Sequence, residues 1–75
     1  MGDVVNYRFY LFNRDGHILE AHVAECDGEG HIRETALSLL VKCKPAVFVE
    51  VWDRATLVYR TERPNPQPNL LERLG

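Results

Sequence analysis

The chain has 75 residues, of which 45% are hydrophobic and 27% are charged, and its formal net charge is −2. This composition is typical of one folded, soluble domain near the lower size limit for a single hydrophobic core, so oligomerisation has to be considered. The acidic balance argues against nucleic-acid and membrane partners, and no apolar stretch approaches the length of a transmembrane helix.

The segment from Tyr7 to Val23 predicts a β-hairpin. Its centre, Asn13-Arg14-Asp15-Gly16, suits a three-residue loop closed by Gly16 in the left-handed region. One face then pairs Leu11 with Leu19, Phe9 with Ala21 and Tyr7 with Val23, and the other pairs Phe12 with Ile18, Tyr10 with Glu20 and Arg8 with His22. A tighter Asp15-Gly16 turn would shift this register by one residue and place Phe9 opposite His22, so we favour the three-residue loop.

A helix is predicted from about Glu29 to Lys42, with Asp27 as its N-cap and Pro45 preventing its continuation. Its apolar residues recur at spacings of three and four, which is typical of a helix with one buried stripe. The stripe contains Ile32, Ala36, Leu39, Leu40 and Cys43, and Leu37 and Val41 widen it.

A second hairpin should follow, formed by residues 46–52 and 57–61. We expect Val47, Val49, Val51, Leu57 and Tyr59 to point inward and Phe48, Glu50, Trp52, Val58 and Arg60 to point outward, because an unpaired buried carboxylate at Glu50 would be costly. The turn contains no glycine, so its register is open by one or two residues. One register places Glu50 opposite Arg60 as a favourable cross-strand pair.

From Arg63 onward the chain alternates proline with polar residues and is not expected to join a sheet. We therefore divide it into one domain, residues 1–63, and a proline-rich C-terminal tail, residues 64–75. Leu70, Leu71 and Leu74 could form one apolar helical turn, which is too short to be stable alone.

These elements predict an α+β fold with the order ββαββ, a four-stranded, mainly antiparallel sheet and one helix packed on one face. The order of the two hairpins in the sheet is left open. The segments Tyr7-Arg8-Phe9-Tyr10, Asp15-Gly16-His17-Ile18, Ala24-Glu25-Cys26, Val49-Glu50-Val51-Trp52 and Leu57-Val58-Tyr59-Arg60 carry a resemblance across residues 7–61. In them the chain resembles a group of short alphaproteobacterial proteins of unknown function. That group has no assigned activity, so the resemblance implies the fold alone.

No cofactor or metal site is predicted. His17, His22, Cys26 and His31 are close in sequence but match no metal-ligand spacing, and acidic neighbours oppose a nucleophilic role for Cys26. Cys26 and Cys43 should lie at opposite ends of the helix, about 20 Å apart, too far for a disulfide. Free thiols and the absence of a secretory signal favour a cytoplasmic location.

Catalysis by acid and base groups is the less favoured interpretation. Glu20, Glu50, Arg8, Arg60 and His22 could share the outer sheet face, but a flat sheet offers no obvious pocket, and solvated ion pairs explain them more simply. We assign no catalytic residue. The alternative function is a small enzyme or ligand-binding protein whose pocket forms at a subunit interface and uses Glu20, Glu50, His22 or Arg60.

The outer sheet face is the strongest functional lead. It should carry Tyr10, Phe12, Ile18, Phe48, Trp52 and Val58, which is too much apolar surface to leave bare on so small a protein. The covering group is a second copy, another protein or the leucines of the tail. The leading hypothesis is a small, cytoplasmic, non-enzymatic interaction module. It is expected to form a homodimer, with Tyr10, Phe12, Phe48 and Trp52 as its partner-binding residues.

Overall fold

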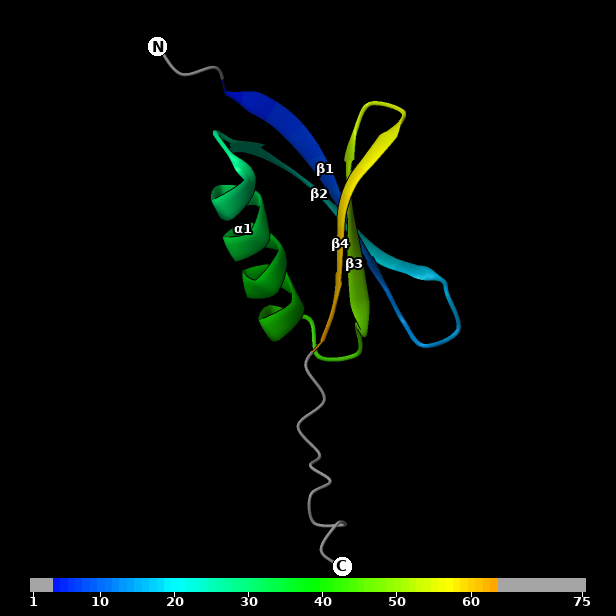
Figure 1. Cartoon of the computed structure of the whole chain (residues 1–75). Coiled ribbons are helices and arrows are strands. Elements are labelled where there is room, and N and C mark those ends of the chain that lie inside the picture. Colours follow the sequence, from blue (N-terminus) through cyan, green and yellow to red (C-terminus); the bar gives the residue numbers. More distant parts are fainter. Residues whose placement is uncertain (1–3, 64–75) are drawn as a thin grey trace, which may run out of the picture.

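The computed structural model describes residues 4–63, so our expectations for the tail, residues 64–75, lie outside the described residues. The elements follow the order β1 (Val5–Phe12), β2 (Ile18–Cys26), α1 (Glu29–Lys42), β3 (Phe48–Asp53) and β4 (Thr56–Glu62). The strands form one antiparallel, four-stranded sheet, with α1 beside one of its faces (Figure 1). The predicted ββαββ fold and the bounds of the helix are confirmed.

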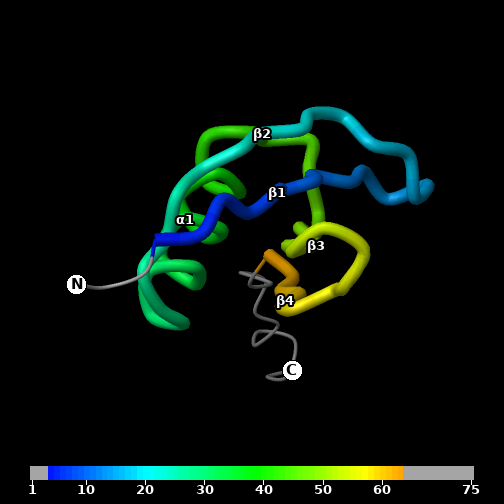
Figure 2. The backbone as a smooth tube through the Cα atoms, turned by 90° about the horizontal axis from the view of Figure 1, so that it is seen from above, coloured from blue at the N-terminus to red at the C-terminus, as the bar shows by residue number. Residues whose placement is uncertain are grey.

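The strand order is β2-β1-β3-β4, so the first strand of each hairpin lies in the centre of the sheet. The two hairpins join through the antiparallel pairing of β1 with β3. Seen from above, the β1–β2 hairpin runs across the view and β3 and β4 are seen nearly end-on, which shows the strong twist of the sheet (Figure 2). This order brings residues from β1, β3 and β4 onto one shared surface.

The hydrophobic core lies between α1 and the sheet. Its buried residues are Phe9, Leu11, Cys26, Ile32, Ala36, Leu40, Cys43, Ala46, Val49 and Val51. The predicted helix stripe is therefore mostly confirmed, with Leu37 and Leu39 partly buried at its edges. Val41 is the exception, because its side chain is 71% exposed on the far side of the helix.

The turn of the first hairpin has the predicted geometry. The backbone N–H of Gly16 donates to the carbonyl of Asn13, and the N–H of Asn13 donates to the carbonyl of His17, both at 3.0 Å. The Asn13 side chain accepts hydrogen bonds from the N–H groups of Asp15 and His17. Gly16 has a φ of 84°, as the left-handed closing position requires.

Beyond this turn the predicted register is wrong. Phe12 pairs with Ile18 as expected, but a bulge at Leu19 shifts every later pair by one residue. Leu11 now pairs with Glu20, Phe9 with His22 and Tyr7 with Ala24. The physical reason is the end of the strand, where the shifted register places Ala24 and Cys26 against the core. The bulge reconciles the register set by the turn with the one set by the core.

The second hairpin also contains a bulge. Glu50 pairs with Arg60, which is one of the registers left open by the sequence, and Val51 pairs with Tyr59, which agrees with the predicted inward position of Tyr59. Trp52, however, pairs with Leu57, so the bulge at Val58 turns Leu57 to the face that carries Trp52. The predicted inward position of Leu57 is therefore wrong, and its side chain is 45% exposed.

The predicted N-cap is also wrong. Gly28 occupies the cap position with an extended backbone, and no side chain caps the helix. The Asp27 carboxylate lies 3.3 Å from Nδ1 of His31 instead. Because His31 is the third residue of α1, Asp27 contacts the first turn through the His31 side chain and does not cap the backbone N–H groups of the helix.

Two glycine substitutions should have opposite effects on stability. Neither Gly16 nor Gly30 has an atom within 4 Å of an added Cβ, so only the backbone conformation distinguishes them. Gly16→Ala should lower the free energy of unfolding by about 1 kcal/mol, because alanine is strained at positive φ. Gly30→Ala should raise it by about 0.5 kcal/mol through helix propensity. Urea denaturation of both variants measures the two changes in the free energy of unfolding. Changes of the same sign would contradict the assigned turn.

Candidate functional site

The outer face of the sheet is the face that points away from α1, and its side chains form three rows across neighbouring strands. Pairing in the ladders defines each row, since directly opposed residues point to the same side. The rows are Ile18, Phe12, Phe48 and Glu62; Ala21, Tyr10, Glu50 and Arg60; and Val23, Arg8, Trp52 and Leu57. All four predicted partner-binding residues lie on this face.

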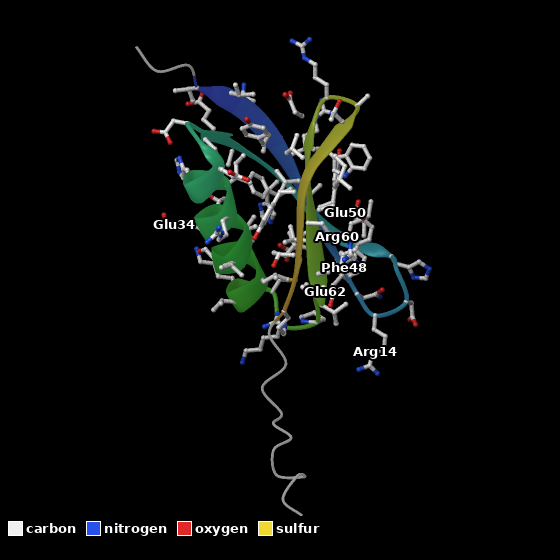
Figure 3. All side chains as sticks on the ribbon, in the orientation of Figure 1. Arg14, Glu34, Phe48, Glu50, Arg60 and Glu62 are labelled. Carbon is white, nitrogen blue, oxygen red and sulfur yellow. The ribbon has the colours of Figure 1, made fainter. Side chains whose placement is uncertain are left out.

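An aromatic stack on the outer face joins Phe12 of β1 with Phe48 of β3. Their rings are stacked with centroids 4.6 Å apart and an interplanar angle of 8°. The Arg60 guanidinium lies over the Phe48 ring, 4.3 Å from its centroid (Figure 3). Stacking and the cation–π contact hold Phe48 in one orientation, with residues from three strands contributing.

Glu50 organises the neighbouring row. Its carboxylate accepts a hydrogen bond of 3.1 Å from the indole N–H of Trp52 and lies 3.9 Å from Nε of Arg60. Arg60 also donates to Glu62, on its own strand, at 3.2 Å. The Glu50 side chain is only 23% exposed, so these partners offset part of the cost of withdrawing its charge from water. Trp52 and Arg60 are positioned by one carboxylate.

The aromatic cluster, defined as Tyr10, Phe12, Phe48 and Trp52, is half-buried rather than bare. The rings and their polar neighbours cover one another, while aliphatic side chains around them remain open to solvent. Ile18 is 56% exposed, Val23 67% and Leu57 45%. The outer face thus has a semi-rigid aromatic centre and an exposed aliphatic rim.

The set of acid and base groups predicted for the outer face is split by the structure. Glu20 and His22 pair with Leu11 and Phe9, whose side chains are buried on the helix side. They contact each other there, with 2.8 Å between His22 Nε2 and Glu20 Oε1. The predicted common location with Glu50 and Arg60 is wrong, and the bulge at Leu19 is the reason.

The histidines and cysteines do not form a site. Within residues 4–63, no group of three metal-ligating side chains is placed to hold an ion. Cys26 is buried, and its Sγ lies 3.9 Å from Oγ1 of Thr35. Cys43 is buried as well, and both thiols are free. These positions make the two cysteines part of the core.

Arg63 has a structural role that its sequence position did not indicate, since it precedes the prolines of the tail. Its Nε donates to the carbonyl of Ala46 at 2.9 Å, and one terminal nitrogen donates to the carbonyls of Cys43, at 2.8 Å, and Leu40. These carbonyls belong to the last turn of α1 and the following loop, which lack helical partners. Arg63 therefore ties the end of β4 to the end of the helix.

Comparison with protein families, with curated proteins and with solved structures finds no match for the chain. Its resemblance to short alphaproteobacterial proteins thus stays a prediction. In the part of the chain that the structure describes, no helix has the length and apolar character needed to cross a membrane. The class that the fold defines is a small α+β protein with one face of its sheet covered by a helix.

Proposed function

We propose that this protein is a small, cytoplasmic, non-enzymatic interaction module that forms a homodimer through the outer face of its sheet. The supporting observation is the distribution of its large side chains. Four of the seven aromatic residues lie on the face that α1 does not cover, surrounded by exposed aliphatic groups. A second copy placed on this face would remove that apolar surface from water.

The aromatic cluster has the properties of a preformed binding centre. Residues that dominate interface energies are enriched in tryptophan, tyrosine and arginine, and they lie centrally in an interface. Here Trp52 is fixed by Glu50, and Phe48 is held between Phe12 and Arg60. Side chains that are already ordered lose little conformational entropy on association, which favours binding.

The charges of the outer face suit association with an identical copy. The centre of the face carries Arg60 together with Glu50 and Glu62. A two-fold interface places one patch against the same patch, so a single sign of charge would repel. A patch that carries both signs can instead place arginine of one copy near glutamate of the other.

The cysteines support the cytoplasmic part of the proposal. Both thiols are free and buried among apolar core residues. Small proteins in oxidising compartments usually use their cysteines as disulfide staples, whereas reduced thiols are typical of the cytoplasm.

The alternative, an enzyme or binding protein with a pocket at the subunit interface, has less support. Its four candidate groups lie on opposite faces of the sheet, with Glu20 and His22 separated from Glu50 and Arg60. Glu50 and Arg60 are engaged with each other and with Trp52 and Phe48. These contacts account for Glu50 and Arg60 as groups that order the surface of the sheet.

A pair of charge substitutions tests the proposed surface. Leu57→Glu adds a charge to the rim of the outer face, and Val41→Glu adds the same charge to the exposed side of α1. Sedimentation velocity of the full chain over a range of concentrations should show a reversible dimer for the wild type and for Val41→Glu. Leu57→Glu should sediment as a monomer. A monomeric wild type, or equal disruption by both substitutions, would refute the proposal.

A further inference from the structure

Strand β1 extends beyond the end of its neighbour β3. The β1–β3 ladder ends where Arg8 pairs with Trp52, whereas the β1–β2 ladder continues to Val5 and Cys26. The tip of the β3–β4 hairpin diverges from β1 at this point (Figure 1). Among residues 4–63, no strand pairs with Val5–Tyr7 on the side of β3. The start of β1 therefore presents a short free edge inside the sheet.

An open cleft of about 900 Å³ lies along this free edge. One wall is the beginning of β1 with Val23 of β2, and the other wall is the hairpin turn of residues 53–56. Val4 and Val23 are both more than half exposed there. The cleft thus combines a free strand edge with exposed apolar side chains. Every second residue of an added strand would point toward these side chains and contact them.

The charged groups of the cleft are Arg8, Arg54 and Asp53. Within the described residues, neither arginine has a carboxylate within 4 Å, although the chain as a whole is acidic. Two guanidinium groups without an ion-pair partner, on opposite walls of one cleft, are complementary to carboxylates.

The backbone conformation of Arg54 follows from its place in the turn between β3 and β4. Its φ is 61°, in the left-handed region, and it is the single non-glycine residue with positive φ among residues 4–63. Glycine or asparagine would adopt this conformation at lower cost. Arg54 is the first central residue of a two-residue hairpin loop between the paired Asp53 and Thr56, and such loops require positive φ at this position. The turn therefore places Arg54 in the wall of the cleft.

We infer that this cleft binds an extended, acidic peptide segment of a partner protein, which adds to the free edge of β1 as a short strand. Backbone hydrogen bonds would supply the pairing, and Arg8 and Arg54 would select carboxylate side chains. The inference goes beyond the proposed function, because it assigns a second binding surface to a different partner. The cleft borders the outer face at Arg8 and Val23, and its other lining residues lie beyond the three rows. Nucleic acid is disfavoured as the ligand because it has no backbone N–H and C=O groups that could pair with the free edge of β1.

The test uses three fluorescein-labelled peptides and the full-length protein. The first is a blocked five-residue peptide of alternating valine and glutamate, the second replaces glutamate with lysine, and the third carries N-methyl groups that prevent strand pairing. Fluorescence anisotropy should show saturable binding of the first peptide alone. Arg8→Gln and Arg54→Gly should each weaken that binding about tenfold, the loss expected for one charge-assisted contact. Arg14→Gln, in the distant hairpin loop, should leave it unchanged.

Arg54→Gly separates binding from folding, because its melting temperature should equal or exceed that of the wild type. The inference is overturned if this variant keeps full affinity for the acidic peptide, or if the lysine peptide or the N-methylated peptide binds equally well. Sedimentation with saturating peptide distinguishes the two surfaces. The dimer should persist, and its dissociation by the peptide would show that the cleft belongs to the dimer interface instead.

Discussion

Replacing Arg63 with methionine should lower the free energy of unfolding by about 3 kcal/mol, which is a large part of the stability of a domain this small. The side chain donates to the carbonyls of Leu40, Cys43 and Ala46, and it is half-buried in doing so. Methionine keeps much of the volume but donates no hydrogen bond. The carbonyls at the end of α1 would then lose their charged donor, and β4 would lose its connection to the helix.

Urea denaturation followed by circular dichroism measures this effect. Arg33→Met is the matched control, because Arg33 is exposed on α1, the helix whose last turn Arg63 contacts. This substitution should change the free energy of unfolding by less than about 0.5 kcal/mol. Arg63→Lys should lie between the wild type and Arg63→Met, since lysine keeps the charge but not the planar set of donors. Equal stability of the two methionine variants would show that the contacts of Arg63 do not hold the elements together.

Phe48→Ala should weaken the dimer about 30-fold or more, which corresponds to at least about 2 kcal/mol for a central interface residue. Phe48 is central because it stacks on Phe12, supports Arg60 and lies in the middle of the first row of the outer face. Alanine removes the stack and leaves Arg60 without its aromatic support. Sedimentation equilibrium of wild type and variant gives the two dissociation constants.

Phe48→Leu provides the matched control for this substitution. Leucine retains most of the apolar area but no aromatic face, so the dimer should be weakened less than by alanine. Circular dichroism of both variants should show the fold of the wild type, because Phe48 lies outside the buried core. An unchanged dissociation constant for Phe48→Ala would remove the aromatic cluster from the interface.

The fold was largely predictable because each element has a strong local signal. The turn from Asn13 to Gly16, the spacing of Ile32, Ala36 and Leu40, and Pro45 after the helix are all local, and the structure has the corresponding elements. The strand order was not predictable in the same way. It depends on which edges of the two hairpins meet when α1 packs, and that choice involves contacts across the whole domain.

The two bulges explain the errors in register. Local turn chemistry correctly predicted the pair next to the first turn, Phe12 with Ile18, whereas the pairing of Glu50 with Arg60 was one of the registers that the glycine-free second turn left open. At Leu19 and Val58 an extra residue enters one strand, and period-two alternation does not reveal such a residue. The consequences reach the site, because one bulge moves Glu20 and His22 away from the outer face and the other moves Leu57 onto it.

The candidate site was partly predictable for the same reason. Tyr10, Phe12, Phe48 and Trp52 lie in strands whose alternation holds, and the structure places all four on one face. The roles of Arg54 and Arg63 arise from a backbone conformation and from contacts with residues up to 23 positions away, respectively. Neither leaves a pattern in the neighbouring sequence.

The most direct test of the central proposal is to detect contacts between two copies by NMR. In a mixture of isotopically labelled and unlabelled protein, filtered nuclear Overhauser spectra report only contacts between copies. Our account predicts such contacts at the methyl groups of Ile18 and Leu57, which are exposed on the outer face, and none at Val41 on the helix. Contacts confined to Val41, or none at concentrations where the protein sediments as a dimer, would contradict it.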